Sequence, residues 1–174
     1  MRNENLILIT SMVIMFVFGC GDNYKYSRDF KLTHVSEKTG ETSIELEGIG
    51  GLQLADGSLS NDSLSVRKYM YGNMTIYYRL LYQRNSFGYD LTPQKITFII
   101  DGQKYIMFFL GSDKSKTLEW AWLTVESPFL EKLAKAKNIS LTIEGSGIAI
   151  DYTFNKKYLY FYKRFYKECV LTEK

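Results

Sequence analysis

Histidine, cysteine and proline are scarce in this chain. Its 174 residues include one histidine, His34, two cysteines and two prolines. With a single imidazole, neither a typical zinc site of three or four ligands nor a serine-hydrolase triad is expected. The sequence also has no Gly-x-Ser-x-Gly motif, and Gly145-Ser146-Gly147 is better explained as a tight turn. We therefore expect no metal ion, no cofactor and no serine nucleophile.

An excess of charge of one sign is also missing. The 22 lysine and arginine residues nearly balance the 19 aspartate and glutamate residues, so the formal net charge is +3. Proteins that bind nucleic acid carry clustered positive charge, and we expect no nucleic-acid partner. Aromatic residues are abundant instead, at 16% of the chain with 14 tyrosines. This enrichment favours β structure, because aromatic side chains pack well on a pleated surface.

An apolar run covers residues 6–18 and follows a short polar start that carries Arg2. A transmembrane helix needs about 20 apolar residues, whereas the core of a signal peptide needs roughly 7–15. The run ends at Gly19-Cys20, after which the sequence turns polar. The segment therefore fits a cleaved leader better than a membrane span.

The tetrapeptide Val17-Phe18-Gly19-Cys20 resembles the lipobox of bacterial lipoproteins. The resemblance implies that type II signal peptidase cleaves before Cys20 and that lipid is attached to its sulfur. Several acyl chains then anchor the protein stably, which a single chain does not. An uncleaved anchor helix and cleavage without lipid are the alternatives.

The lipobox divides the chain into three expected parts. These are a signal peptide at residues 1–19, a lipidated tether at 20–29 and a single extracytoplasmic domain at 30–174. The resemblance implies a protein held on the membrane through Cys20, outside the cytoplasm, at the outer membrane or cell surface rather than the inner membrane.

Alternation of apolar and polar residues predicts antiparallel hairpins in this domain. The clearest has Asp101-Gly102 at its turn, a pair typical of two-residue type I′ turns. Such a turn places Phe98 across from Tyr105, so that apolar groups meet. A further strand is predicted at residues 118–125, with Trp120 and Trp122 on one face.

Two more hairpins are expected around Gly72-Asn73 and Gly145-Ser146. In the first, Ile76, Tyr78, Leu80 and Tyr82 share one face, which we predict to be core. In the second, the turn would pair Ile143 with Ile148. Residues 55–63 and 111–116 are predicted to be loops. The first is polar and solvated, and it does not match an EF-hand loop, which needs glycine at its sixth position and glutamate at its twelfth.

Two helices are predicted in the C-terminal half. Ser127 is predicted to cap the free N–H groups at the start of the first, and Pro128 suits its first helical position. This helix buries a stripe of apolar residues. The second begins at Asn155 and runs to about Cys169, which we expect to be a small buried residue. The sequence thus predicts an α+β fold of antiparallel β-hairpins with two helices in the C-terminal half.

Tyrosine and arginine residues alternate along the two arms of the first hairpin. Pairing of the arms would bring together one set of candidate ligand-binding residues: Arg67, Tyr69, Tyr71, Tyr77 and Arg79. If this face is uncovered, its flat aromatic and charged groups suit a polysaccharide, an anionic polymer or a protein. The alternative is that these side chains only decorate the outside of a sheet whose other face is core.

These observations favour a non-enzymatic binding or scaffolding domain, anchored by lipid in the bacterial envelope, whose partner is a polysaccharide or a protein. One alternative is an envelope glycan hydrolase that uses a carboxylate pair. Its candidates would come from five acidic residues: Asp90, Glu119, Glu126, Glu144 and Asp151. The other alternative is an inhibitor or assembly factor for another envelope protein, which an exposed edge strand or apolar patch would favour.

Overall fold

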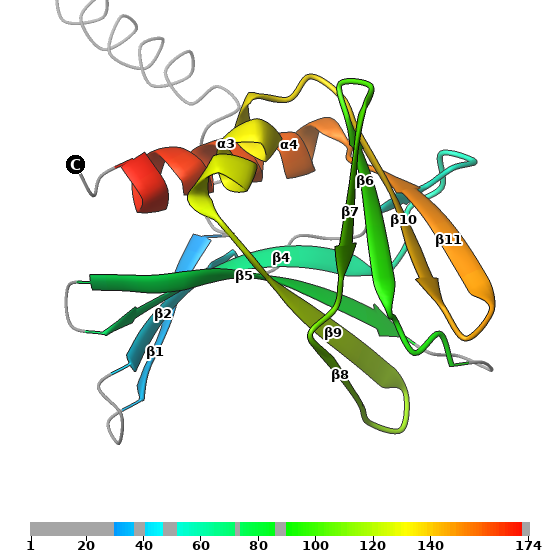
Figure 1. Cartoon of the computed structure of the whole chain (residues 1–174), viewed down its shortest axis with the longest axis horizontal. Helices are drawn as coiled ribbons and strands as arrows, with labels where there is room; N and C mark the ends of the chain where they lie inside the picture. Colours follow the sequence, from blue (N-terminus) through cyan, green and yellow to red (C-terminus); the bar gives the residue numbers. More distant parts are fainter. Residues whose placement is uncertain (1–29, 37–40, 47–51, 72–73, 86–89, 172–174) are drawn as a thin grey trace, which may run out of the picture. The chain divides into compact units, whose positions relative to one another are not determined.

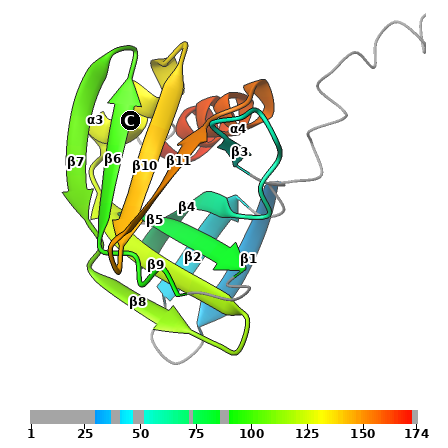
Figure 2. The ribbon, with the colours of Figure 1, turned by 90° about the vertical axis from the view of Figure 1, so that its right-hand side faces the viewer.

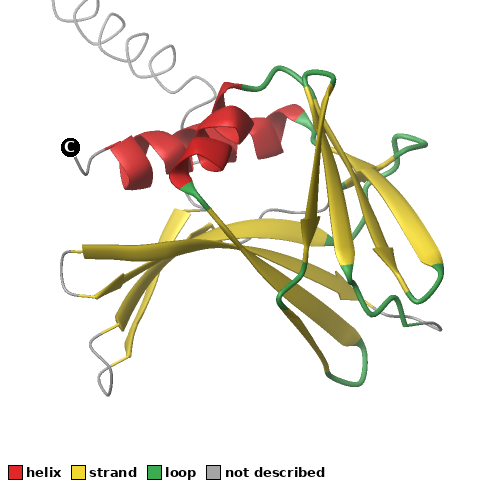
Figure 3. Ribbon diagram, in the orientation of Figure 1, coloured by secondary structure: helices red, strands yellow, loops and turns green. Residues whose placement is uncertain are grey.

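The computed structural model describes residues 30–36, 41–46, 52–71, 74–85 and 90–171. The expected signal peptide and tether, including Cys20, lie outside the described residues. From Lys31 onward the chain forms one compact unit. It consists mainly of antiparallel strands, with its helices in the C-terminal half (Figure 3). The α+β class is therefore confirmed in outline, with β structure predominating.

The larger of two sheets has six strands in the order β1-β2-β4-β5-β9-β8. The pairs from β2 through to β8 are antiparallel. The prediction of a loop at residues 111–116 is wrong in part, because β8 pairs with β9 there. This edge strand is mostly polar and exposed, so it lacks the apolar alternation that marks other strands. The strands are β1 (Phe30–Ser36), β2 (Glu41–Leu46), β4 (Ser63–Tyr71), β5 (Met74–Asn85), β8 (Gly111–Lys114) and β9 (Leu118–Val125).

The second sheet has five strands in the order β3-β11-β10-β6-β7. Its β6–β7 hairpin confirms the predicted register, since Phe98 pairs with Tyr105. At its turn, Asp101 and Gly102 have φ angles of 48° and 87°, as a type I′ turn requires. The strands are β3 (Gln53–Leu54), β6 (Lys95–Ile100), β7 (Gln103–Phe108), β10 (Ile139–Gly145) and β11 (Ile148–Thr153).

The predicted register of the β10–β11 hairpin is wrong by two residues. Ile143 pairs with Ile150, and Gly145 pairs with Ile148. The positive φ angles fall at Ser146 and Gly147, so these residues form the turn. Because side chains alternate with a period of two, the shift leaves the isoleucines on the face where they were expected.

The first helix, α3 (Ser127–Lys135), buries the apolar stripe that the sequence predicted. Its N-cap is Glu126, which makes no side-chain capping bond, so the assignment of Ser127 as the cap is wrong. Pro128 still lies in the first turn, where its missing N–H has no cost. The cap position is fixed by the end of β9 at Val125, which the local sequence does not reveal.

The second helix, α4 (Lys156–Phe165), begins as predicted, with the Asn155 side chain accepting a hydrogen bond from the Tyr158 N–H. It continues into a π-helical turn, η2 (Tyr166–Val170). Cys169 is buried there, as expected. The Lys68 ammonium donates a 2.7 Å hydrogen bond to the Cys169 carbonyl, which ties β4 to the end of the helix.

The core lies on one face of the six-stranded sheet, which is covered by α3, α4 and the five-stranded sheet (Figures 1 and 2). Tyr78, Leu80 and Tyr82 point to this face and are buried, which confirms the prediction for these three, whereas the Ile76 side chain lies outside the described part of the structure. The Tyr78 ring contacts Phe165 of α4 edge to face, at a centroid distance of 6.4 Å. Among the described residues, no element covers the opposite face of this sheet.

Asp62 was expected in a solvated loop, but the structure buries it between the two sheets with 7% of its surface exposed. The Tyr152 hydroxyl donates to its carboxylate at 2.5 Å, and the hydroxyls of Tyr152 and Tyr82 lie 2.8 Å apart. Burial, together with the charge of Asp62, raises the pKa of Tyr82 well above its usual value. This arrangement joins distant segments, so the local polar composition could not predict it.

A second buried carboxylate, Glu119, links the six-stranded sheet to the segment that precedes β6. It accepts hydrogen bonds from the backbone N–H groups of Leu91 and Thr92, at 3.1 and 3.2 Å. The Arg84 guanidinium lies 3.5 Å from the same carboxylate and 4.0 Å from that of Asp62. Hydrogen bonds from Tyr152 of β11 and from the Leu91 and Thr92 N–H groups link this ionic network to the five-stranded sheet and to the segment before it.

Candidate functional site

The uncovered face of the six-stranded sheet carries rings and cations from β4, β5 and β9. Strand alternation produces this face, because the neighbouring residues of each strand are buried in the core. Register partners across the strands include Arg67 with Arg79, and Tyr69 with Tyr77. We call the following set the aromatic–basic face: Arg67, Tyr69, Tyr77, Arg79, Leu81, Trp120 and Trp122.

Arg79 is central to this face and is surrounded by aromatic rings. Its guanidinium carbon lies 5.1 Å from the ring centroid of Tyr69, 5.3 Å from that of Tyr77 and 5.9 Å from that of Trp122. Each such cation–π contact is worth about 0.5–1 kcal/mol at an exposed site and more when it is desolvated. The three rings therefore hold the guanidinium in a defined place.

The tyrosines on this face are themselves held in position. The rings of Tyr69 and Tyr77 are stacked, with centroids 4.5 Å apart and an angle of 21° between their planes. Arg67 donates a 3.2 Å hydrogen bond to the Tyr69 hydroxyl. A ligand would meet rings that are already ordered, so little side-chain entropy remains to be lost on binding.

Gly111 of β8 makes room for the Trp122 indole. A Cβ atom at this position would lie 2.3 Å from the nearest ring carbon of Trp122. The absence of a side chain lets the ring lie against the β8 backbone. Next to it is a hollow of about 250 Å³, lined by Arg67, Tyr69, Arg79, Leu81, Trp120 and Trp122.

The structure brings together four of the five candidate residues. Tyr71 is separated from them, because the β4–β5 register shifts after Tyr69 and Tyr71 then pairs with Met74 at the end of the hairpin. It is 56% exposed and does not line the hollow. Trp120 and Trp122 were not among the candidates, because the pairing of β9 with β5 joins segments that are far apart in sequence.

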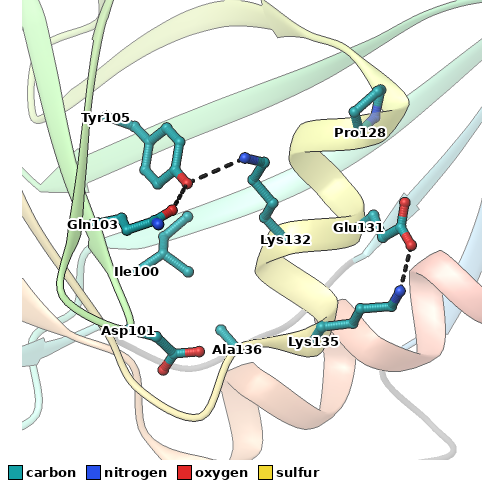
Figure 4. A pocket seen from close by; sticks show the side chains of 9 residues that line it. All are labelled: Ile100, Asp101, Gln103, Tyr105, Pro128, Glu131, Lys132, Lys135 and Ala136. Carbon is teal, nitrogen blue, oxygen red and sulfur yellow. Dashed lines mark hydrogen bonds and ion pairs between the residues drawn. The ribbon is translucent and has the colours of Figure 1, made fainter.

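A second hollow, of about 510 Å³, lies between the tip of the β6–β7 hairpin and α3 (Figure 4). Its polar groups bind one another. The Lys132 ammonium donates to the Tyr105 hydroxyl at 3.2 Å, and that hydroxyl donates to Gln103 at 2.6 Å. The residues lining it are Ile100, Asp101, Gln103, Tyr105, Pro128, Glu131, Lys132, Lys135 and Ala136.

Asp101 at the edge of this second hollow also has internal partners. Its carboxylate accepts hydrogen bonds from the backbone N–H groups of Asn138 and Lys137, which lower its pKa. Glu131 pairs with Lys135 on the exposed side of α3. We interpret this hollow as a contact that joins the hairpin to the helix rather than as a ligand site.

Four of the five acidic residues considered for glycan hydrolysis have structural partners. Glu144 pairs with Lys95 at 2.6 Å, and Asp90 pairs with Lys114 at 2.5 Å. Asp151 accepts a hydrogen bond from Thr142, whereas Glu119 belongs to the interior network. Glu126, the fifth, is the N-cap of α3. In the part of the chain that the structure describes, no cluster of three or more His, Cys, Asp or Glu residues could hold a metal ion.

Comparison of the chain with protein families, with curated proteins and with solved structures found no match. None of the helices within the described ranges is long and apolar enough to cross a membrane. The aromatic–basic face must therefore be interpreted from its own geometry.

Proposed function

We propose that this protein is a lipid-anchored component of the bacterial envelope, located outside the cytoplasm, which binds a polysaccharide without acting on it as an enzyme. The observation that supports the proposal is the aromatic–basic face, where four ordered rings and two arginines lie together on the uncovered side of a sheet. Tryptophan, tyrosine and arginine are the residues that contribute most at binding surfaces.

The chemistry of sugars matches this face. A pyranose ring has a flat, apolar C–H surface and a rim of hydroxyls, so it stacks on an aromatic ring while its hydroxyls bind polar groups. Trp120 and Trp122 supply broad rings, and the tyrosine hydroxyls and arginines supply polar partners at their edges. A surface without a deep cavity suits a polymer that passes across it, because the chain need not end at the site.

Truncation of Trp122 tests this proposal. We expect Trp122→Ala to weaken binding of the full chain, in detergent micelles, to immobilised envelope polysaccharide by about ten-fold to a hundred-fold, as for the loss of a central aromatic contact. Affinity electrophoresis measures the change. Phe108→Ala is the matched control, because Phe108 is 67% exposed on the other sheet. Equal binding by both variants and the wild type would remove the aromatic–basic face from consideration.

The anchor is supported by the lipobox residues that end at Cys20. Growth with a fatty-acid analogue should label the wild-type protein and leave the Cys20→Ala variant unlabelled, because the sulfur that carries the lipid is gone. The variant should also leave the membrane fraction. Unchanged labelling of the variant would contradict attachment at Cys20 while leaving the binding proposal open to its own test.

A second candidate function is that of an inhibitor or assembly factor for another envelope protein. It is favoured by β7, the outermost strand of the five-stranded sheet among the described residues. Three large apolar side chains are exposed on or next to this strand: Ile106 at 53%, Phe108 at 67% and Leu110 at 70%. An extended segment of a partner could add to this edge as a further strand. Phe108→Ala would then weaken capture of the partner, whereas Trp122→Ala would not.

A further inference from the structure

We infer that the ligand of the aromatic–basic face is an acidic glycan, and that Arg79 binds the oxyanion of a sugar unit whose ring lies in the hollow beside Trp120 and Trp122. This inference rests on the proposed function and narrows it from polysaccharides in general to those with carboxylate or sulfate groups. It is based on the pairing, the surroundings and the geometry of Arg79.

Two like charges lie side by side on this face. Arg67 and Arg79 are direct register partners on neighbouring strands, so their side chains share one face. Like charges directly opposite each other destabilise a sheet. A bound anion would convert this repulsion into attraction, because two guanidinium groups would then approach one negative group.

The guanidinium of Arg79 has aromatic rather than acidic neighbours. Within the described ranges it forms no ion pair, and its buried Nε has no hydrogen-bond partner. By contrast, Arg84 lies beside two carboxylates and Arg164 pairs with Glu168 at 2.8 Å. Because no acidic residue of the described ranges pairs with Arg79, an anion bound on this face would supply the counter-charge that it lacks there.

The register partners of Arg79 are not acidic. They are Arg67 on one side and Thr124 on the other. Asp113, an exposed acid of β8, is the register partner of Trp120. On the neighbouring strands, no acid therefore lies directly opposite Arg79.

The size and shape of the hollow beside Arg79 limit what it can hold. Pockets that enclose drug-sized ligands measure roughly 300–1,000 Å³, and the hollow beside Arg79 measures about 250 Å³. It suits one sugar unit, with the rest of the polymer extending over the sheet. The planar fork of a guanidinium matches the two oxygens of a carboxylate or sulfate, and the surrounding rings fix where that fork lies.

Binding of chemically matched polymers tests the inference. Four probes are compared with the full chain in detergent micelles: alginate, carboxyl-reduced alginate, dextran sulfate and dextran. We expect the wild type to bind alginate, dextran sulfate or both at least about ten-fold more tightly than the matched neutral polymer, as for a charge-assisted hydrogen bond. Comparison of the alginate and dextran sulfate arms shows whether the recognised oxyanion is a carboxylate or a sulfate.

Variants assign this preference to Arg79. Arg79→Gln should abolish the preference for the charged polymer, and Arg79→Lys should restore only part of it, because lysine keeps the charge without the planar fork. Arg164→Gln is the matched control: it removes the same charge from α4 and should leave the preference intact. Equal loss in both variants would mean that only net charge matters and would overturn the inference.

The possible results distinguish failure of the acidic-glycan inference from failure of the proposed polysaccharide binding. If the wild type binds the charged and neutral polymers equally, the acidic-glycan inference is wrong while the proposed polysaccharide function stands. If none of the four polymers binds, both the acidic-glycan inference and the proposed polysaccharide function are wrong. This comparison needs only the wild-type protein, so it does not depend on the folding of any variant.

Discussion

Replacing Glu119 with alanine is expected to destabilise the fold by about 3–5 kcal/mol, the usual effect of removing one partner from a buried ionic contact. The carboxylate is 97% buried as a side chain and lies 3.5 Å from the Arg84 guanidinium. It also accepts the N–H groups of Leu91 and Thr92. Alanine would leave these two backbone donors without their acceptor. Chemical denaturation, followed by tyrosine and tryptophan fluorescence, measures the loss.

The Glu119→Gln variant is the matched control. Its amide oxygen can still accept one of the two N–H groups, so we expect a smaller loss of about 1–3 kcal/mol. The difference between the two variants reports the role of the oxygen acceptors. If alanine and glutamine at this position both left the free energy of unfolding unchanged, Glu119 would not hold the sheets together.

Replacing Gly145 with alanine is the second change for which we expect a large effect. A Cβ atom at this position would lie 2.2 Å from the Thr92 carbonyl oxygen and 2.3 Å from that of Leu91. Both contacts are with backbone, which cannot rotate away as a side chain can. Overpacking of this kind costs about 1–3 kcal/mol and occasionally more. We expect the upper end of that range, measured again by denaturation.

Two features make this segment sensitive. Thr92 has a φ angle of 46°, which costs a non-glycine residue about 1–3 kcal/mol. The conformation therefore depends on the contacts with Glu119 and Gly145 on either side. The control is Gly102→Ala, where a Cβ would meet no atom within 4 Å and only the positive φ opposes it. If Gly145→Ala proved no more harmful than this control, the close approach at Gly145 would be contradicted.

The sequence predicted the elements whose signals are local. The β6–β7 turn is specified by Asp101-Gly102, which adopt the two positive φ angles that the turn needs. The burial of Tyr78, Leu80 and Tyr82 follows from alternation within a single strand. The β10–β11 register was predicted wrongly by two residues, because Gly145 was assigned to the turn. It lies instead at the end of the strand, where the Leu91 and Thr92 carbonyls leave no room for a Cβ atom.

The candidate site was predicted in part for the same reason. Arg67, Tyr69, Tyr77 and Arg79 belong to adjacent arms of one hairpin, so alternation and a turn were enough to bring them together. Trp120 and Trp122 join them through the β5–β9 pairing, with β6, β7 and β8 between these strands in sequence. No local pattern specifies that pairing. The two tryptophans on one face of a predicted strand were the available signal, but the sequence did not show which strand lies beside them.

The most direct test of the aromatic–basic face uses the fact that the chain contains only two tryptophans, both of which lie on it. In a ¹H–¹⁵N spectrum of the full chain in detergent micelles, each indole N–H gives a separate signal. Titration with alginate or dextran sulfate, whichever binds more tightly, should shift both signals along one saturable curve, and Arg79→Gln should weaken that curve. Saturable binding that leaves both indole signals in place would contradict the account, because the ligand would then occupy another surface.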